Sequence, residues 1–431
     1  MVDSISEGMS KNITTAGGAE RMIERIVESI TPIYFSAGKV PIAIEIRDFD
    51  YPSIGSKFAK VRCRFGDLTE DFVVKYYYES GNGAYQKLPT RKSRASTENS
   101  LMKMYRNEGF ESVPKSFMEP RQRDILYMKD VGDIPAERKL RENPDKQKKI
   151  LQEILLVLSR FHAIGKRKGF SLPSRGDYDR LLKSRNFNDV GNALLHHYIG
   201  SKENSFTELR EDFRKSFSFL GNYLEEKVDQ IIHGDLNTYH IIFNNGNMNI
   251  LDLEKAKLGH VTQDLAGLLC SPEVKLSSIE AEELLKEYKR EYETFNSALK
   301  VGIKGIRRPI RDAGRILDSL VEVDERVTND FIKTFYYSAV FECFRRCGKM
   351  LELKDKYPET YRRFVARYPG YINAETKYSQ KITEITGVIK GRKDKLFSEE
   401  EEKRFIDLEK VITRVFLAAY LGNDAPIDKV P

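Results

Sequence analysis

IIHGDLNTYHIIFNNGNMNILDLEKAKLGHVTQDLAGLL, residues 231–269, contains three of the six histidines in the chain. Two short apolar runs flank Asn-Asn-Gly-Asn, a strong short-range signal for a β-hairpin. A hairpin brings its two ends together, so His240 at its entry must approach Asp252 at its exit. Asp235 lies just upstream, in a polar turn that follows a short apolar strand. The stretch therefore predicts one carboxylate in an exposed turn beside a pair of polar residues.

The length of the hairpin loop decides which residues face each other. A two-residue loop, Asn245-Gly246, pairs position 240 with 251 and sends the side chains of His240 and Asp252 to opposite faces. A three-residue loop with a glycine bulge pairs position 240 with 252 directly, on one face. Because a ligand shared by His240 and Asp252 requires the second register, we predict the three-residue loop.

The residue types in this stretch suit phosphoryl transfer. That reaction needs a carboxylate to accept the proton of the attacking hydroxyl, and ligands that hold Mg²⁺ against the phosphates. The protein does little covalent chemistry in it, so positioning and charge compensation dominate. The stretch therefore indicates a phosphotransferase; a structural hairpin with incidental polar residues is the alternative.

Three motifs, HGDL, ILDLEKA and QDLAGLL, follow one another in the stretch. Their order and spacing resemble the superfamily of aminoglycoside and choline kinases, which are small-molecule kinases with a protein-kinase-like fold. The resemblance implies that Asp235 is the catalytic base and that His233 braces the catalytic loop. It also implies that Asp252 is the principal Mg²⁺ ligand and that Asp264 accepts hydrogen bonds from the catalytic-loop backbone. SRFHAIG, around His162, is similar to a helix end of the same family.

His240 departs from the family pattern, which usually has Asn at this second metal position. Imidazole is a softer ligand than an amide oxygen and suits transition metals better than Mg²⁺. Some lipopolysaccharide-core sugar kinases are similar in carrying His here. Three readings stay open: His240 binds metal weakly, it donates a hydrogen bond to nucleotide phosphates, or the protein is an impaired kinase.

A kinase-like N-terminal lobe needs a strand lysine for the nucleotide phosphates and a helical glutamate that holds it. EDFVVKYYY places Lys75 on the third predicted strand, and STENSLMKMY places Glu98 in the following helix. A lysine between Val and Tyr in a strand is otherwise a surface residue whose ammonium reaches water. The order strand, lysine, helix, glutamate favours the functional interpretation.

DILYMKDVGD, residues 124–133, resembles the hinge strand that passes behind the adenine. The resemblance implies that the backbone of Tyr127, Met128, Lys129 and Asp130 contacts the base. The family often has Glu where Lys129 stands, so the choice between ATP and GTP stays open.

The loop between the first two predicted strands, DYPSIGSKFAKV, would cover the phosphates. It has a single glycine and lacks the glycine-rich pattern of protein kinases. Hydroxyl groups and backbone N–H groups can serve phosphates in its place. On this reading the phosphate contacts are Ser53, Gly55 and Ser56; an ordinary β-turn is the alternative.

Composition indicates a globular chain: 431 residues, 40% hydrophobic and 11% aromatic. No apolar run is long enough for a transmembrane helix, and the polar start MVDSISEGMSKN is unlike a secretory signal. The four cysteines lack metal-ligand spacing, which favours a reducing compartment, and we expect a cytoplasmic protein. Cys343 and Cys347 lie one helical turn apart; two small residues of an amphipathic helix explain them better than a metal or redox pair.

The charge balance, 72 basic against 65 acidic residues, gives a net charge of +7. Over this length it is a mild bias towards anionic partners and does not indicate nucleic-acid binding. Basic runs at 91–94 and 300–315 favour an anionic acceptor, with solvated helix faces as the alternative. Peripheral membrane contact and oligomeric state stay open.

We therefore predict an α+β, bilobal, protein-kinase-like fold. Residues 1–40 form an extension with a helix, residues 41–131 a small β-rich N-lobe, and residues 132–431 a mainly helical C-lobe with the catalytic loop and acceptor site. Within the N-lobe, the helix that carries Glu98 is expected to start at Ser96 or Thr97 as its N-cap and to end before Gly109. Breaks between helices are expected in the C-lobe at Pro309, Pro358 and Pro369.

The predicted reaction transfers the γ-phosphoryl group of ATP or GTP, with Mg²⁺ or Mn²⁺, to a hydroxyl of a small molecule or sugar. One alternative is a pseudokinase that binds nucleotide or partners without turnover. The other is a protein Ser/Thr kinase. Against the latter, no Ala-Pro-Glu follows Asp252, and Asp264 comes only twelve positions later, which leaves no room for an activation loop.

Overall fold

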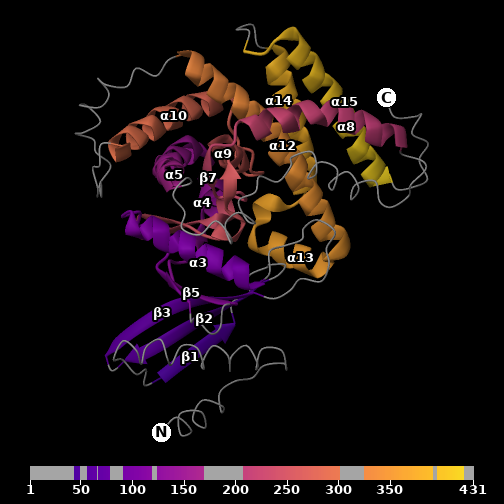
Figure 1. Ribbon diagram of the computed structural model, residues 1–431. Coiled ribbons are helices and arrows are strands. Elements are labelled where there is room, and N and C mark those ends of the chain that lie inside the picture. Colours follow the sequence, from indigo (N-terminus) through magenta and orange to yellow (C-terminus); the bar gives the residue numbers. More distant parts are fainter. Residues whose placement is uncertain are drawn as a thin grey trace.

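The computed structural model describes residues 43–48, 56–65, 67–77, 91–118, 124–168, 207–300, 325–391 and 396–421. The helix expected within residues 1–40, the loop residues Ser53 and Gly55, and nearly all of the basic run at 300–315 lie outside the described residues. A small sheet forms one end of the molecule and a large helical part forms the other (Figure 1). The architecture is α+β with two lobes, as the sequence predicts.

The N-lobe is a five-stranded antiparallel sheet with strand order β1-β2-β3-β5-β4. The strands are β1 (Ala43–Asp48), β2 (Ser56–Phe65), β3 (Leu68–Tyr77), β4 (Ser116–Phe117) and β5 (Ile125–Lys129). Side chains alternate along β3. Phe72 and Val74 pack on one face in a small apolar cluster, whereas Lys75 and Tyr77 face helix α3 (Arg91–Asn107). Figure 1 shows α3 between the sheet and the helical lobe.

Helix α3 starts earlier than predicted. Neither Ser96 nor Thr97 is an N-cap, because the helix begins at Arg91 and both residues lie within it. Its buried face already includes Arg94 and Ala95, one turn before Glu98. Packing of that face therefore outweighs the local capping signal. The C-terminal end agrees with the prediction, since Gly109 follows the helix with φ +75°.

The C-lobe is mainly helical. Its α-helices are α4 (Ala136–Glu142), α5 (Gln147–Lys168), α8 (Thr207–Glu226), α9 (Val261–Leu269), α10 (Ser278–Lys300), α12 (Glu325–Lys356), α13 (Pro358–Arg367), α14 (Ala374–Gly391) and α15 (Glu399–Leu421). Its short 3-10 helices are η2 (Pro144–Lys146), η3 (Thr238–His240), η4 (Leu253–Lys255) and η5 (Pro369–Tyr371). Two small antiparallel sheets complete the lobe, one formed by β6 (Ile134–Pro135), β8 (Ile241–Asn244) and β9 (Asn247–Ile250), the other by β7 (Gln230–Ile232) and β10 (Lys257–Gly259).

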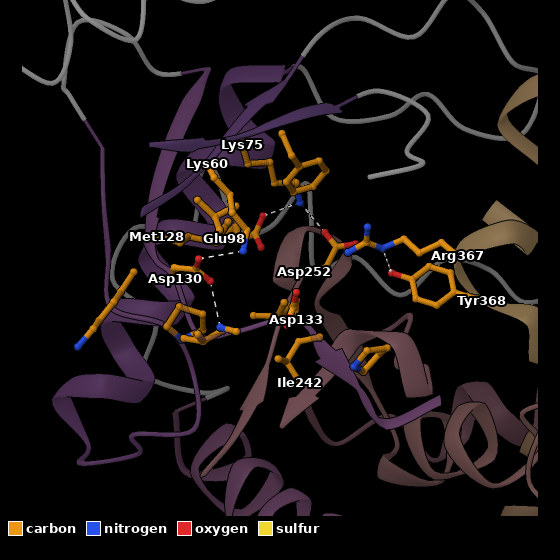
Figure 2. Close-up of a pocket in the computed structure, with 18 residues that line it drawn as sticks. Lys60, Lys75, Glu98, Met128, Asp130, Asp133, Ile242, Asp252, Arg367 and Tyr368 are labelled. Carbon is orange, nitrogen blue, oxygen red and sulfur yellow. Dashed lines mark hydrogen bonds and ion pairs between the residues drawn. The ribbon is translucent and has the colours of Figure 1, made fainter. Parts of the chain in front are cut away.

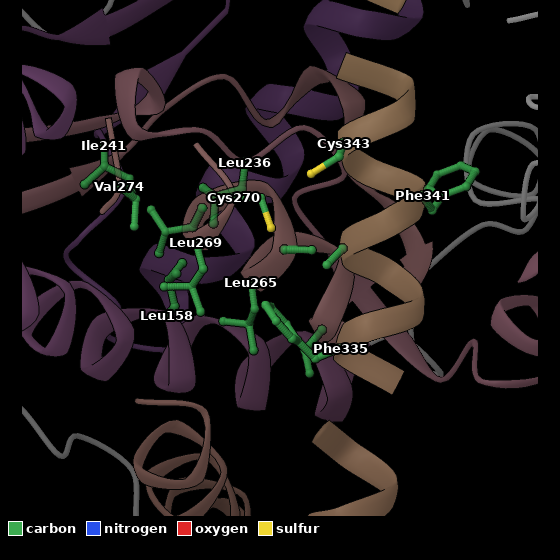
Figure 3. Close-up of a cluster of buried hydrophobic side chains, with 14 of the residues drawn as sticks. Leu158, Leu236, Ile241, Leu265, Leu269, Cys270, Val274, Phe335, Phe341 and Cys343 are labelled. Carbon is green, nitrogen blue, oxygen red and sulfur yellow. The ribbon is translucent and has the colours of Figure 1, made fainter. Parts of the chain in front are cut away.

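The long helix α12 organises the core of the C-lobe. It packs against α8, α9, α10, α13 and α14. Figure 3 shows the apolar side chains that fill the space between α9 and α12, among them Leu265 and Phe335. Cys270 and Cys343 belong to the same buried cluster. All four cysteines lie within the described residues and none forms a disulfide, so they act as small packing residues.

Prolines mark two of the helix boundaries, as predicted: Pro358 opens α13 and Pro369 opens η5. The third expected break, Pro309, lies outside the described residues. Each occupies the first turn, where its missing N–H costs no hydrogen bond. Among the described residues, no helix combines the length and apolar character needed to cross a bilayer.

The predicted register of the central hairpin is wrong. Ile241 pairs with Ile250, so the loop has only the two residues Asn245 and Gly246, and the N–H of Leu251 donates to the carbonyl of His240 at 2.8 Å. Both loop residues have positive φ, 48° and 79°. Asn-Gly adopts such a type I′ turn at little cost, and its twist matches that of the strands. Position 240 therefore faces 251 and not 252.

Candidate active site

Lys75 is the centre of a buried ion cluster that joins the two lobes. Its ammonium lies 2.9 Å from Glu98 on α3, 2.5 Å from Asp252 and 2.9 Å from Glu254, and only 2% of its side chain is exposed. Burial disfavours the charged lysine, but the three carboxylates outweigh it and hold the pKa of Lys75 well above its usual value. Glu98 also accepts the N–H of Leu253 at 3.1 Å, which ties α3 to the segment after the hairpin.

Arg94 belongs to the same cluster. Its guanidinium donates to both carboxylate oxygens of Glu254, at 2.8 and 2.9 Å, and the side chain is buried. The basic run at 91–94 was interpreted as a surface for an anionic acceptor. That interpretation is wrong for Arg94, whose charge is neutralised by the buried ion pair with Glu254.

Asp264, in the first turn of α9, holds the turn before Asp235 in place. One of its carboxylate oxygens accepts the N–H of His233 at 2.7 Å and lies 3.0 Å from Nε2 of His162. The other accepts the N–H of Gly234 at 2.9 Å. Gly234 has φ +77°, and a Cβ there would lie 2.4 Å from the carbonyl oxygen of Lys255. The turn thus requires glycine for its backbone conformation and for space.

His233 is fully buried and both of its ring nitrogens are engaged. Nε2 lies 2.7 Å from the carbonyl oxygen of Leu251, which can only accept, so Nε2 carries the proton. Nδ1 accepts the N–H of Asp235 at 3.3 Å. Burial lowers the pKa of His233, which keeps the ring neutral. His233 is therefore a positioning residue that links the end of β9 to the turn containing Asp235.

The carboxylate of Asp235 is almost completely buried, with 3% of the side chain exposed. Its Oδ2 lies 2.5 Å from the ammonium of Lys255 and 3.3 Å from that of Lys349, and its Oδ1 lies 3.1 Å from the guanidinium of Arg345. Burial alone would raise the pKa of Asp235, but the three cations outweigh it and hold that pKa well below its usual range. Asp235 is therefore ionised at neutral pH.

His240 and Asp252 meet in spite of the register. Asp252 lies just beyond β9 and has left-handed backbone angles, φ 66° and ψ 52°. This turn of the chain directs its carboxylate back, so that Oδ2 lies 3.2 Å from Nε2 of His240. Nδ1 of His240 donates to the carbonyl oxygen of Asp235 at 2.9 Å. The two side chains therefore meet, as predicted, although the hairpin geometry proposed to bring them together is wrong.

A pocket between the lobes contains this carboxylate and Lys75 (Figure 2). Its apolar walls come from both lobes: Phe58, Val73, Met128, Ile242 and Leu251. Apolar walls from two lobes suit a flat aromatic ring, and Lys75 and Asp252 line the same pocket. Arg367, at the end of α13, points towards Asp252 in Figure 2.

A family model described as "Phosphotransferase enzyme family" matches residues 62–301, more than half of the chain. The chain belongs to this phosphotransferase family. The matched region contains Lys75, Glu98 and the whole stretch from His233 to Asp264. The protein is thus a small-molecule kinase, as the sequence indicated.

One solved structure of similar shape supports the fold, and two others are similar to a lesser degree. The phosphotransferase is similar to a choline kinase from Cryptosporidium parvum, with 12% identity, a TM-score of 0.51, and coverage of 86% of this chain and 93% of the other. It also matches an ethanolamine kinase from Plasmodium vivax, with 10% identity, a TM-score of 0.48 and coverage of 87% and 94%. A choline kinase from Streptococcus pneumoniae has 14% identity, a TM-score of 0.42 and coverage of 84% and 99%. No curated protein sequence matches the chain significantly.

The pair His240 and Asp252 in this phosphotransferase fits a divalent metal ion. Nδ1 of His240 carries a proton because its partner is a carbonyl oxygen. In the neutral ring, Nε2 then carries a lone pair and lies beside a carboxylate oxygen of Asp252, so both atoms could serve as ligands of a divalent ion. Glu98, Asp252 and Glu254 also bring three carboxylate oxygens within 4.8 Å of one another, but the ammonium of Lys75 lies among them. That second group is therefore the counter-charge of Lys75.

The predicted hinge residues differ in where they lie. Met128, Lys129 and Asp130 line the pocket, whereas Tyr127 is buried and stacks on Phe117, with ring centroids 5.0 Å apart. The N–H of Lys129 donates to the carbonyl of Lys115 at 2.9 Å, and the N–H of Asp130 donates to that of Asp71 at 3.1 Å. These two N–H groups serve the sheet, so other backbone groups of the hinge are better placed to contact a base.

The predicted phosphate-loop contact Ser56 does not line this pocket. It is buried at the start of β2, where it pairs with Tyr77 of β3. Strand pairing continues to this residue, so Ser56 belongs to the sheet and not to a loop over the phosphates. Ser53 and Gly55 lie outside the described residues.

Several charged residues of the site were missed from the sequence. Lys255 lies within the quoted ILDLEKA motif, but lysine has no assigned role there. The others lie on α12 and α13, and none belongs to a recognised motif: Arg345, Arg346, Lys349 and Arg367. Their only signal is the spacing of Arg345 and Lys349, which places them one turn apart on the same face of a helix.

Proposed function

We propose that this phosphotransferase moves the γ-phosphoryl group of ATP or GTP to a hydroxyl group of a small molecule or sugar. The observation that carries the proposal is the convergence of three groups from separate segments. His240 donates a hydrogen bond to the backbone carbonyl of Asp235, whose carboxylate is ionised, and lies 3.2 Å from Asp252, which contacts Lys75. Phosphoryl transfer needs a base, metal ligands and a phosphate-binding lysine arranged in space next to one another.

Each residue has a separate task in the proposed reaction. Lys75, held by Glu98, would pair with the nucleotide phosphates. Asp252 and His240 would hold Mg²⁺ or Mn²⁺, which neutralises charge on the phosphates when it is bound. The oxygen of the acceptor hydroxyl forms a bond to the γ-phosphorus, and the bond from that phosphorus to the bridging β–γ oxygen breaks. The hydroxyl proton passes to the carboxylate of Asp235.

The apolar walls of the pocket support a nucleotide base as the group bound between the lobes. Met128 and Val73 from the sheet and Ile242 and Leu251 from the hairpin would lie against the ring. The charged side of the same pocket, with Lys75 and Asp252, would then face the phosphates. This orientation points the γ-phosphate towards the turn that contains Asp235.

Replacing the proposed base tests the function. Asp235→Asn should reduce nucleotide consumption and acceptor phosphorylation by at least about 1,000-fold, because the proton acceptor is lost. Nucleotide affinity, measured by calorimetry with the Mg²⁺ complex, should stay within about twofold. Asp145→Asn, an exposed aspartate in η2, is the matched control and should behave as the wild type. Unchanged turnover in Asp235→Asn would refute the assignment.

The same measurements separate an enzyme from a pseudokinase. Asp252→Asn should weaken binding of the Mg²⁺–nucleotide complex in either case, because a ligand charge is removed. Only an enzyme also loses acceptor-dependent nucleotide consumption. A wild-type protein that binds nucleotide yet consumes none with any acceptor is a pseudokinase.

A further inference from the structure

Three cations surround the carboxylate at which an acceptor hydroxyl must bind. Lys255 comes from η4, directly after the hairpin, and Arg345 and Lys349 come from adjacent turns of α12. Their distances to Asp235 are 2.5, 3.1 and 3.3 Å. Like charges one turn apart on a helix repel each other, so this face of α12 is stable only with negative charge opposite it.

The positive charge here exceeds the negative charge. Arg346 is the fourth cation; it donates to the carbonyl oxygen of Leu236 at 2.6 Å and to Glu342 at 3.3 Å. Glu342 also contacts Arg345 at 2.7 Å. Four cations thus share two carboxylates, Asp235 and Glu342, an excess of two positive charges. Asp252 and Glu254, which also act on Lys255, are paired with Lys75 and Arg94. Glu352, which acts on Lys349, is paired with Lys356.

Both oxygens of Asp235 are occupied by these cations. An acceptor hydroxyl needs one of the two oxygens, so one cation must give up its contact. Lys349 has the longest contact and the most exposed side chain, 36% against 26% for Lys255 and 18% for Arg345. Arg345 is also restrained by Glu342. Lys349 is therefore the group that moves, and a displaced ammonium beside three other cations needs a new anionic partner.

We propose that the acceptor carries an anionic group, phosphate or carboxylate, beside the hydroxyl that is phosphorylated, and that Lys349 and Arg345 bind this group. The inference rests on the proposed function, since it places the acceptor at Asp235. The basic runs from which an anionic acceptor was first suggested, 91–94 and 300–315, take no part in it.

The arrangement couples recognition to catalysis. When Lys349 transfers its contact to the acceptor anion, an oxygen of Asp235 becomes available to the hydroxyl and the carboxylate loses one of three cations. A neutral acceptor offers Lys349 no partner, so Lys349 stays on Asp235. Discrimination should therefore appear in kcat as well as in KM.

The same cations would bind the γ-phosphate of the nucleotide if that group reached Asp235. The two cases differ in what Lys349 recognises. If it recognises the nucleotide, its loss raises the KM for ATP; if it recognises the acceptor, its loss raises the KM for the acceptor alone. Lys349→Gln removes the charge and keeps a polar, unbranched side chain that is one atom shorter. Lys356→Gln is the matched control, because Lys356 lies on the same helix and contacts Glu352.

The first experiment measures nucleotide consumption with matched acceptors: glycerol against glycerol 3-phosphate, glucose against glucose 6-phosphate, and choline as a cationic acceptor. We expect the anionic member of a pair to have a kcat/KM at least about tenfold higher, the effect of one hydrogen bond to a charged group. Lys349→Gln should abolish that preference and leave the KM for ATP unchanged. Preference for a neutral acceptor or choline overturns the inference and leaves the phosphotransferase function intact.

The second experiment does not depend on the choice of acceptor. Protein saturated with Mg²⁺ and a non-hydrolysable ATP analogue, whose γ-position is filled, is titrated with inorganic phosphate by calorimetry. We expect binding in the wild type, a Kd about tenfold or more higher in Lys349→Gln, and a wild-type Kd in Lys356→Gln. No phosphate binding, or equal binding in all three proteins, overturns the inference. Failure of the proposed function would show separately, as unchanged turnover in Asp235→Asn.

Discussion

Nε2 of His240 lies 3.2 Å from Oδ2 of Asp252, although the hairpin does not pair these two residues. The left-handed backbone of Asp252 produces the contact: a residue with φ 66° turns its side chain away from the face that strand alternation gives it. Aspartate accepts such a conformation more readily than most residues. One backbone conformation thus does what the predicted bulge was expected to do.

His240→Asn should change the metal preference of the enzyme. Imidazole nitrogen favours transition metals, whereas an amide oxygen is a harder ligand. The wild type should have a higher ratio of Mn²⁺- to Mg²⁺-supported nucleotide consumption than the variant. Direct Mn²⁺ binding, followed by electron paramagnetic resonance, should weaken in the same variant. Equal ratios and equal Mn²⁺ affinity in both proteins would show that His240 is not a metal ligand.

Lys75→Met should destabilise the fold as well as impair nucleotide binding. It leaves the carboxylates of Glu98, Asp252 and Glu254 together without the cation that contacts all three. Removing one partner from a buried ion cluster costs about 3–5 kcal/mol of unfolding free energy. Urea denaturation measures this loss.

A second substitution tests the electrostatic cause. Adding Asp252→Asn to Lys75→Met removes one of the uncompensated charges, so the double variant should be more stable than Lys75→Met alone. Additive losses in the double variant would instead point to lost packing as the cause.

Gly234→Ala should destabilise the protein by more than the cost of a left-handed backbone at an alanine. A Cβ at this position would lie 2.4 Å from the carbonyl oxygen of Lys255. Gly246 is a matched control, because its φ of +79° is nearly the same and no atom lies within 4 Å of a Cβ built there. We expect Gly246→Ala to cost about 1 kcal/mol for the left-handed conformation alone. Gly234→Ala should cost clearly more and reduce turnover; equal losses of stability would contradict the predicted clash.

Glu273→Gln should remove a pH dependence of stability. Burial raises the pKa of Glu273 to about 7, although the hydroxyl of Thr238 donates to its carboxylate. Between pH 4.5 and about 7 the folded protein holds a proton that the unfolded chain releases. The free energy of unfolding therefore falls as pH rises through this window, by about 3 kcal/mol at most, and changes little above it.

The comparison is made by thermal denaturation at two pH values. At pH 8 the Glu273→Gln variant should be more stable than the wild type, because it has no buried charge to accommodate. At pH 5 the two Tm values should lie close together, since the wild-type side chain is then protonated. A constant difference between the two proteins at both pH values would argue against a raised pKa.

The sequence predicts the parts of the site that depend on short-range patterns. The strand that carries Lys75, the helix that carries Glu98 and the order of Asp235, Asp252 and Asp264 all follow from local motifs. The partners of Asp235 do not, because Arg345 and Lys349 lie more than 100 positions away on a helix whose sequence has no motif. Which charges meet in space depends on how α12 packs against the catalytic loop.

Charge runs in the sequence were misleading for a related reason. Arg94 belongs to a conspicuous basic run, yet its charge is neutralised by an ion pair with Glu254 inside the protein. Lys349 lies in a less conspicuous context and reaches the carboxylate of Asp235. A run of like charges shows where cations occur along the chain, but not which of them keep a charge for a ligand after folding.

Arg346 gives the C-terminal helices a role in the reaction centre itself. Its guanidinium holds the carbonyl oxygen of Leu236, next to Asp235, and lies against Gly267, where a Cβ would come within 2.4 Å of it. Yet α12 begins at Glu325, beyond residue 301, where the match to the family ends. A shortened protein that stops there would keep the base, the metal ligands and the phosphate lysine but lose the support of its catalytic turn. Substrate choice in this phosphotransferase can therefore evolve on a helix that leaves the shared chemical core unchanged.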